Sequence, residues 1–147
     1  MHKMDRRNFL GAGAALAATS LTACASFERK PIARVVVIGG GFGGATAAKY
    51  IRLWAPEIEV VLVEREAAFV SCPLSNLVLA GTEKIENLTT GYDALQRKYG
   101  VKVVRDEALA IDAEKRTVRL ARGDTLAYDR LIVSPGVDFQ YDQTPGL

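Results

Sequence analysis

Residues 35–44 read Val-Val-Val-Ile-Gly-Gly-Gly-Phe-Gly-Gly, an apolar β-branched run that leads directly into a cluster of glycines. Within this stretch Gly39, Gly41 and Gly44 have the spacing Gly-x-Gly-x-x-Gly, which is the dinucleotide-binding fingerprint. The first glycine permits a tight turn from strand to helix, the second lets backbone approach a pyrophosphate, and the third lets the helix pack closely on the strand. The pyrophosphate would then lie at the helix N-terminus, where unpaired N–H groups and the positive dipole end favour an anion.

The sequence on both sides of the glycines has the pattern of a βαβ unit. Residues 35–38 read as a buried parallel strand, and residues 45–51 read as a helix with small side chains toward the sheet. Pro56 prevents the helix from continuing, and residues 58–63 form a second apolar run that reads as a parallel strand. This order of elements favours a Rossmann-like α/β domain over a glycine-rich turn of another kind.

Glu64 ends the second apolar run, 25 positions after Gly39, close to where such domains place a carboxylate that binds the ribose hydroxyls. A carboxylate would repel a 2′-phosphate, so the ADP-ribose part of FAD or NAD fits better than that of NADP. The alternative is an ordinary surface glutamate in a βαβ unit. The cofactor-binding residues predicted at this end of the domain are Gly39, Gly40, Gly41, Phe42, Gly43, Gly44, Glu64 and Arg65.

The second half of the sequence predicts a helix, a third buried strand and then a β-meander. Residues 92–99 read as a short helix ended by Gly100, and residues 101–104 read as the strand. Short runs with alternating apolar and polar residues, separated by turn residues, predict three further strands at residues 108–112, 116–120 and 125–128. The meander would connect the strand of residues 101–104 to the next parallel strand, at residues 130–134. Such a β-meander crossover is typical of one large class of FAD-binding domains, whereas ordinary NAD-binding domains use a helix at this point.

The strand after the meander lies in a motif that resembles the second FAD motif of flavoproteins with two dinucleotide-binding domains, such as the disulfide reductases. The motif runs from Tyr128 to Gly136 and reads Tyr-Asp-Arg-Leu-Ile-Val-Ser-Pro-Gly. The resemblance implies that Gly136 lies near the FAD. We therefore expect a Rossmann-like FAD-binding domain with a parallel sheet and a β-meander crossover, incomplete at the C-terminus.

Length and charge set limits on the function. The 147 residues suffice for one domain but are few for a two-nucleotide oxidoreductase, and residues 143–147 resemble a loop. We therefore expect residues 26–147 to be the N-terminal portion of a longer FAD-binding domain. The net charge of +2 arises within the first 25 residues, and the remainder has 16 basic and 16 acidic residues. This balance gives no indication of a nucleic acid partner.

Residues 1–25 have the pattern of an export signal. Arg6-Arg7 is followed by Phe9-Leu10 and a weakly apolar stretch, which predicts a twin-arginine signal peptide and a periplasmic protein. The stretch is too short and too rich in glycine for a stable membrane span, and its apolar residues form no stripe that would indicate an amphipathic helix. Ala23-Cys24-Ala25 fits simple cleavage, which we favour, whereas residues 21–24 resemble a lipoprotein box in which a lipid on Cys24 would attach the protein to the membrane.

Cys72 is the cysteine that remains after cleavage of the signal, within the sequence Phe-Val-Ser-Cys-Pro-Leu-Ser-Asn of residues 69–76. The sequence contains no Cys-x-x-Cys-His motif and no zinc-type cluster, so we expect no metal, and any haem must belong to a partner. Cys72 follows Glu64 by eight positions, near enough to reach from the ribose toward a flavin. From spacing alone Cys72 could be a buried core filler, a thiolate that attacks the flavin, or an unlinked thiol that accepts sulfur as a persulfide.

The chain as a whole resembles the flavoprotein subunits of flavocytochrome c sulfide dehydrogenases. The shared features are the twin-arginine leader, the glycines of 39–44, Glu64, Cys72 with Ser75-Asn76, and the motif of 128–136. This resemblance implies FAD attached through a thioether between Cys72 and the 8α-methyl carbon. It also implies sulfide as substrate and a c-type cytochrome subunit as electron acceptor. We further expect the backbone of Ala108 to contact the adenine.

Two other functions fit the same residues. A sulfide:quinone reductase or a type II NADH:quinone reductase uses the same nucleotide fold, but such enzymes stay on the bilayer surface without a twin-arginine leader. A truncated, non-catalytic nucleotide-binding module is the second alternative. We expect a periplasmic sulfide:cytochrome c oxidoreductase when the protein is full length, with the 147 residues alone inactive.

Overall fold

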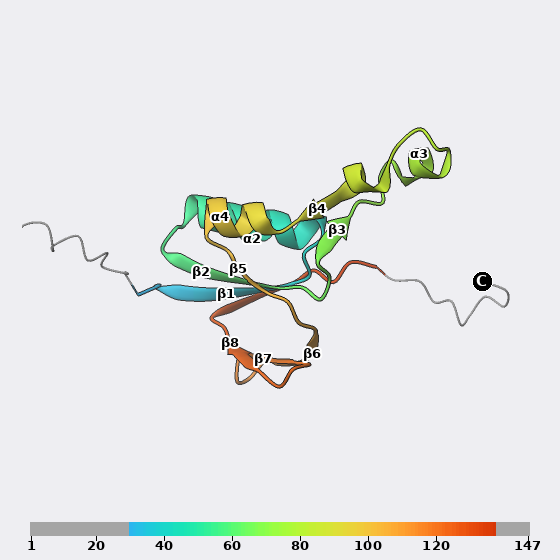
Figure 1. Cartoon of the computed structure of the whole chain (residues 1–147). Helices are drawn as coiled ribbons and strands as arrows, with labels where there is room; N and C mark the ends of the chain where they lie inside the picture. The colour runs from blue at the N-terminus through green and yellow to red at the C-terminus, as the bar shows by residue number, and fades with distance from the viewer. Residues whose placement is uncertain (1–29, 138–147) are drawn as a thin grey trace, which may run out of the picture.

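The computed structural model describes residues 30–137, and a parallel sheet forms its centre (Figure 1). Four strands lie in the order β5-β2-β1-β9 and all pair in parallel. They are rich in Val, Ile and Leu because both faces of a parallel sheet are covered. The predicted Rossmann-like arrangement is confirmed. The strands span Ala33–Ile38 (β1), Ile58–Val63 (β2), Lys102–Val104 (β5) and Arg130–Val133 (β9).

Helices α2 (Phe42–Trp54) and α4 (Asp93–Tyr99) lie on one face of this sheet (Figure 1). The buried positions of α2 are Gly44 and Ala48, so small residues allow it to pack closely on β1 and β2, as predicted. Helix α2 begins three residues earlier than predicted, because Gly41 acts as its N-cap directly after the glycine turn. The core on this face consists of Val35, Val37, Ala48, Val60, Leu62, Tyr92 and Val101.

The β-meander covers the opposite face of the sheet (Figure 1). It is a three-stranded antiparallel sheet formed by β6 (Ala108–Asp112), β7 (Thr117–Leu120) and β8 (Thr125–Ala127). The predicted crossover between β5 and β9 is therefore confirmed, although the start predicted for the middle strand was one residue early, since Arg116 lies in a turn with a φ of 52°. A second core joins the two layers through Val36, Val61, Val63, Val118 and Leu120.

Between β2 and α4 the chain forms an arm that projects from the body of the domain (Figure 1). Strands β3 (Ala68–Val70) and β4 (Thr89–Gly91) pair in antiparallel orientation at its base. Helix α3 (Ser75–Leu79) and the 3₁₀-helix η1 (Ile85–Leu88) lie between these two strands. The sequence patterns predict no helix or strand in this arm, because elements of three to five residues are too short to show a period.

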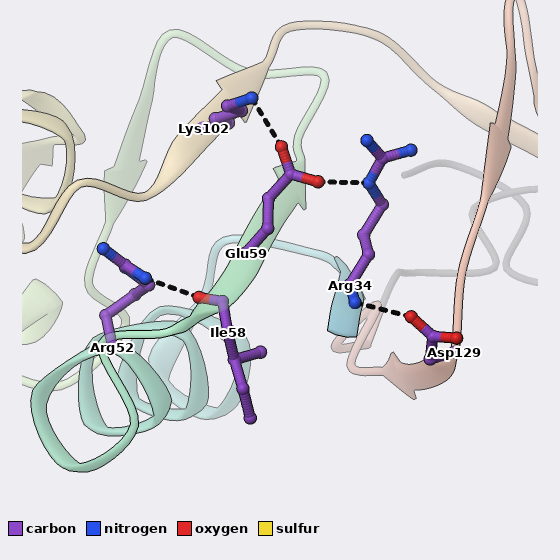
Figure 2. A network of polar contacts seen from close by, with 6 residues as sticks. All are labelled: Arg34, Arg52, Ile58, Glu59, Lys102 and Asp129. Atoms are coloured by element: carbon purple, nitrogen blue, oxygen red, sulfur yellow. Dashed lines mark hydrogen bonds and ion pairs between the residues drawn. The ribbon is translucent and has the colours of Figure 1, made fainter. Parts of the chain in front are cut away.

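An ion-pair network joins three strands at the amino end of the sheet (Figure 2). The Glu59 carboxylate on β2 accepts hydrogen bonds from Arg34 on β1 and from Lys102 on β5. Only 9% of the Glu59 side chain is exposed. The backbone N–H of Arg34 in turn donates to Asp129 Oδ2 at 2.6 Å. The network therefore connects neighbouring strands at the end of the sheet that lies far from the glycine turn.

Replacing Glu59 with glutamine is expected to lower the free energy of unfolding at neutral pH by about 1 to 2 kcal/mol, between the values typical of exposed and of buried ion pairs. Hydrogen bonding from Lys102, followed by that from Arg34, lowers the pKa of Glu59. Because the pKa is lower in the folded state, this stabilisation is present above the pKa of the unfolded chain. It is lost as the pH falls through the folded-state value.

Urea unfolding of the full-length protein at neutral and acidic pH measures this effect. The difference between wild type and Glu59→Gln should shrink toward zero in acid. Glu57→Gln, which changes an exposed carboxylate two residues away, is the matched control and should cost little at either pH. A difference that stays constant across the pH range would show that the carboxylate charge of Glu59 does not stabilise the sheet.

Candidate cofactor-binding site

The carboxyl ends of the parallel strands meet at one edge of the sheet, and the predicted cofactor-binding residues begin there. The glycine turn follows β1, Glu64 follows β2, and residues 134–136 follow β9. Ile38, the last residue of β1, pairs with Val63 on one side and with Val133 on the other. The segments that follow these three strands therefore start side by side at the same edge of the sheet. Open α/β sheets bind their ligands at this edge.

Two of the glycines are required by the packing of the chain itself. Gly39 has a φ of +94°, and a Cβ at this position would lie 2.1 Å from the carbonyl oxygen of Ser134. A Cβ at Gly44 would lie 1.8 Å from the carbonyl oxygen of Gly39. Gly39 thus permits the tight turn after β1, and Gly44 permits the helix to approach it. These contacts agree with the roles predicted for the two residues.

Gly41 differs from these two, because the chain leaves room for a side chain there. The nearest atom to a Cβ at Gly41 would be Cε2 of Phe69 at 3.5 Å, an ordinary van der Waals distance, and the φ of −70° suits most residues. Packing within the described residues therefore does not explain the glycine. A ligand that approaches the backbone would explain it. Gly41 is also the N-cap of the 13-residue helix α2, whose unpaired N–H groups favour an anion.

Glu64 lies against the glycine turn, where two backbone hydrogen bonds hold its carboxylate. Oε2 accepts the N–H of Gly40 at 2.6 Å, and Oε1 accepts the N–H of Glu66 at 2.8 Å. A carboxylate has about four lone-pair sites, so each oxygen keeps capacity to accept a ribose hydroxyl. The bond to Gly40 connects this carboxylate to the glycine turn, and its role in binding ribose remains a prediction. The N–H groups at the start of α2 suit a pyrophosphate, and the Glu64 carboxylate suits the hydroxyls of a ribose.

A cleft of about 560 Å³ opens beside the glycine turn. Its wall combines the start of α2, the base of the arm and the start of α4. The rings of Phe42 and Phe69 meet edge to face in this wall, with centroids 4.8 Å apart. An apolar cleft next to a pyrophosphate site is suited to an aromatic ring system such as a flavin. Residues that line the cleft include Gly40, Gly41, Phe42, Phe69, Ser71, Pro73 and Tyr92.

Cys72 lies next to this cleft in the loop between β3 and α3. The residue is exposed, and its neighbours Ser71 and Pro73 both line the cleft. The exposure of Cys72 contradicts the alternative that it is a buried core filler. Leu74 has a φ of 71°, an uncommon conformation for a residue with a side chain, so the loop turns sharply before α3. Cys72 is therefore open to solvent at the border of the cleft, between two residues that line it.

Comparison with known proteins agrees with this geometry. Residues 33–147 match the family described as pyridine nucleotide-disulphide oxidoreductase. The chain belongs to this family of FAD-dependent oxidoreductases. It is 64% identical over 45 residues to the sulfide dehydrogenase (flavocytochrome c) flavoprotein chain of Chlorobaculum thiosulfatiphilum, a match that covers 31% of this chain and 94% of that sequence.

Two further matches come from one relative in Aquifex aeolicus. The chain is 29% identical over 102 residues to the sulfide-quinone reductase of strain VF5, a match that covers 69% of this chain and 24% of the reductase. The crystal structure of the sulfide:quinone oxidoreductase from this bacterium superimposes with a TM-score of 0.68 at 28% identity. That alignment covers 72% of this chain and 25% of the other. The chain thus spans about a quarter of the length of this relative.

The other residues predicted to bind the cofactor form no hydrogen bond with Glu64 or Gly41 within the described part of the chain. Gly43 lies beside β9, where a Cβ would come within 2.6 Å of Ser134 Oγ. Gly136 is exposed, with a φ of +81° and open space around it. Arg65 is exposed and lies 3.6 Å from the Glu66 carboxylate. Their predicted contacts with FAD remain predictions.

Ala108 begins β6 and packs partly against the core beneath the meander. Asp106 lies two residues before Ala108, and its N–H donates to the backbone oxygen of Glu64 at 3.2 Å. This hydrogen bond holds the start of β6 near Glu64. Asp106 is only 8% exposed and accepts the N–H groups of Glu107 and Arg122. No local pattern selects this aspartate, because Arg122 lies 16 positions away from it in the sequence and Glu64 lies much further away. A contact of Ala108 with adenine remains a prediction.

Several predictions for this family member concern residues beyond the described range. The predicted signal peptide of residues 1–25, including Cys24, lies outside residues 30–137. Within that range, no helix is both long enough and apolar enough to cross a bilayer. The same residues contain no group of three or more His, Cys, Asp or Glu side chains that could hold a metal ion.

Replacing Glu64 with alanine is expected to weaken FAD binding by about ten- to a hundredfold, since a hydrogen bond to a charged group contributes roughly 1.5 to 3 kcal/mol. Equilibrium titration needs a full-length protein that also carries Cys72→Ala, so that FAD can dissociate. Glu66→Ala is the matched control, because Glu66 contacts Glu64 through its backbone N–H, which this substitution retains. Unchanged FAD affinity in Glu64→Ala would remove Glu64 from the ribose site.

Proposed function

We propose that the full-length protein is a periplasmic FAD-dependent enzyme that oxidises sulfide and passes the electrons to a c-type cytochrome subunit. The observation that carries this proposal is the exposed thiol of Cys72, next to the cleft that begins at the glycine turn. The 64% identity over 45 residues to a sulfide dehydrogenase flavoprotein chain supports the same substrate and partner. Membership of the pyridine nucleotide-disulphide oxidoreductases supports FAD as the cofactor.

Different described residues would bind the pyrophosphate, the ribose and the flavin of FAD. The N-terminus of α2 at Gly41 holds the pyrophosphate, and the Glu64 carboxylate accepts the ribose hydroxyls. Cys72 would hold the flavin through a thioether to its 8α-methyl carbon. Forming this S–C bond would break a C–H bond of the methyl group, and the oxidised flavin itself would take up the two electrons, which the cytochrome acceptor would then remove. When bound, FAD supplies an acceptor that takes two electrons from sulfide and releases them to a one-electron partner.

Two features support a periplasmic enzyme with a tethered cofactor. The twin arginine at Arg6-Arg7 directs a protein to export after it has folded, which allows cofactor loading in the cytoplasm. A covalent bond through Cys72 would then prevent loss of FAD in a compartment that does not supply it. The membrane would be a further partner only if a lipid is attached to Cys24.

A sulfide:quinone reductase is the second candidate, favoured by the similarity to the Aquifex aeolicus enzyme over 69% of the chain. The two candidates share the substrate and differ in the electron acceptor. A c-type cytochrome encoded by a neighbouring gene would favour the first candidate. A non-catalytic module would bind nucleotide without turnover.

Anaerobic reduction of the full-length protein purified from the periplasm tests the proposal. Added sulfide should bleach the yellow flavin absorbance, and NADH at the same concentration should not. Oxidised c-type cytochrome should then restore the colour much faster than a soluble quinone. Rapid reoxidation by quinone alone would support the second candidate. A colourless protein that does not bind added FAD would contradict both.

A further inference from the structure

Tyr92 lies directly beneath the glycine turn, although it is 52 residues away in the sequence. The residue is 7% exposed and belongs to the core formed with α2 and the sheet. A Cβ added to Gly40 would lie 2.5 Å from the Tyr92 hydroxyl oxygen and 2.6 Å from its Cε1. The end of the tyrosine ring therefore occupies the space that a side chain at position 40 would need.

The peptide of Gly40 is held from two sides. Tyr92 lies on the side where the glycine lacks a side chain, and the N–H of Gly40 donates to Glu64 Oε2 at 2.6 Å. Burial, followed by the charges of Glu64 and Glu66, raises the pKa of Tyr92 to about 12. The Tyr92 hydroxyl is therefore neutral well beyond physiological pH.

We propose that Tyr92 is a positioning residue for the adenosine end of FAD. By filling the space below Gly40, it keeps the N–H of Gly40 on the Glu64 carboxylate and so fixes that carboxylate for the ribose. The proposal rests on FAD binding as proposed above and adds a residue that contacts the turn from below. It also explains why position 40, which the Gly-x-Gly-x-x-Gly fingerprint leaves free, is a glycine in this chain.

The affinity for ADP tests this role, since ADP contains the adenosine and pyrophosphate but no flavin. The measurement uses full-length protein with Cys72→Ala, freed of FAD. Tyr92→Leu should weaken ADP binding by about five- to twentyfold, because the ring no longer supports Gly40. Tyr92→Phe keeps the ring and should stay within about twofold of wild type. Tyr50→Leu, a change of an exposed tyrosine on α2, is the control and should leave ADP affinity unchanged.

A double-mutant cycle separates positioning from a general loss of structure. If Tyr92 acts through Glu64, Tyr92→Leu should cost less than about twofold in a protein that already carries Glu64→Gln. Equal losses with and without Glu64 would overturn the proposal, as would wild-type ADP affinity in Tyr92→Leu.

The same cycle can be made at Gly40 if Tyr92→Leu does not fold. Gly40→Ala should weaken ADP binding at least tenfold, and most of this loss should disappear when Glu64→Gln is also present. Additive losses from Gly40→Ala and Glu64→Gln would overturn the proposal. These outcomes differ from failure of the proposed FAD binding, in which the parent protein itself would bind neither FAD nor ADP, and from a different electron acceptor, which would leave ADP binding unchanged.

Discussion

Full-length protein carrying Cys72→Ala should lose its flavin completely on denaturation, whereas wild type should keep a fluorescent flavin on the polypeptide in a denaturing gel. The reason is that a thioether survives unfolding and the noncovalent contacts of the glycine turn do not. Cys72 is exposed, and the residues on both sides of it line the cleft beside that turn. An exposed thiol at the border of the cleft can form a thiolate, the form of cysteine that acts as a nucleophile.

Two control variants make the result specific to this sulfur atom. Cys72→Ser keeps the size and polarity of the side chain, yet it should also lose the flavin, because its hydroxyl is a much weaker nucleophile than a thiolate. Cys24→Ala removes the other cysteine of the chain and should leave the fluorescent band unchanged. A tryptic flavin-peptide that contains Cys72 would identify the bond by mass. A wild-type band without fluorescence would show that the proposed tether does not exist.

The parts of the fold that the sequence predicted correctly depend on local patterns. The buried strands β1 and β2 each end in four consecutive apolar residues, and the meander shows alternation between turn residues, so both could be predicted without knowledge of their neighbours. The turn at Gly39 and the packing at Gly44 follow from glycine spacing alone. Glu64 could be placed near the turn because the carboxyl ends of parallel strands meet at one edge.

The parts that were missed depend on contacts between distant residues or on short elements. Tyr92 was read as the first residue of a helix, and nothing within its neighbourhood in the sequence indicates that it lies under Gly40. Glu59 likewise looks like a polar interruption of a strand, although cations from both neighbouring strands surround it. The arm contains elements of three to five residues, which have no measurable period. Sequence patterns therefore identified the cofactor edge but not the residues that support it.

Alanine at Gly41 and alanine at Gly44 should have opposite consequences, although the same methyl group is added three residues apart. At Gly44 the new Cβ would lie 1.8 Å from the carbonyl oxygen of Gly39, and backbone atoms cannot yield as a flexible side chain does. Overpacking typically costs about 1 to 3 kcal/mol, and a contact this short with backbone atoms belongs at the upper end of that range. Gly44→Ala should therefore lower the free energy of unfolding by that amount even without cofactor.

Gly41→Ala has no such clash within the described residues, since its Cβ would meet only Phe69 at 3.5 Å. Its unfolding free energy without cofactor should stay within about 1 kcal/mol of wild type, because the loss of a glycine N-cap is offset by reduced entropy of the unfolded chain. FAD affinity should nevertheless fall by at least about tenfold, since the methyl group occupies the space through which the pyrophosphate approaches the backbone. Urea unfolding and FAD titration, both in full-length protein with Cys72→Ala, separate the two effects. If Gly41→Ala bound FAD as tightly as its parent, the pyrophosphate could not lie against this residue, and the open space at Gly41 would lose its explanation.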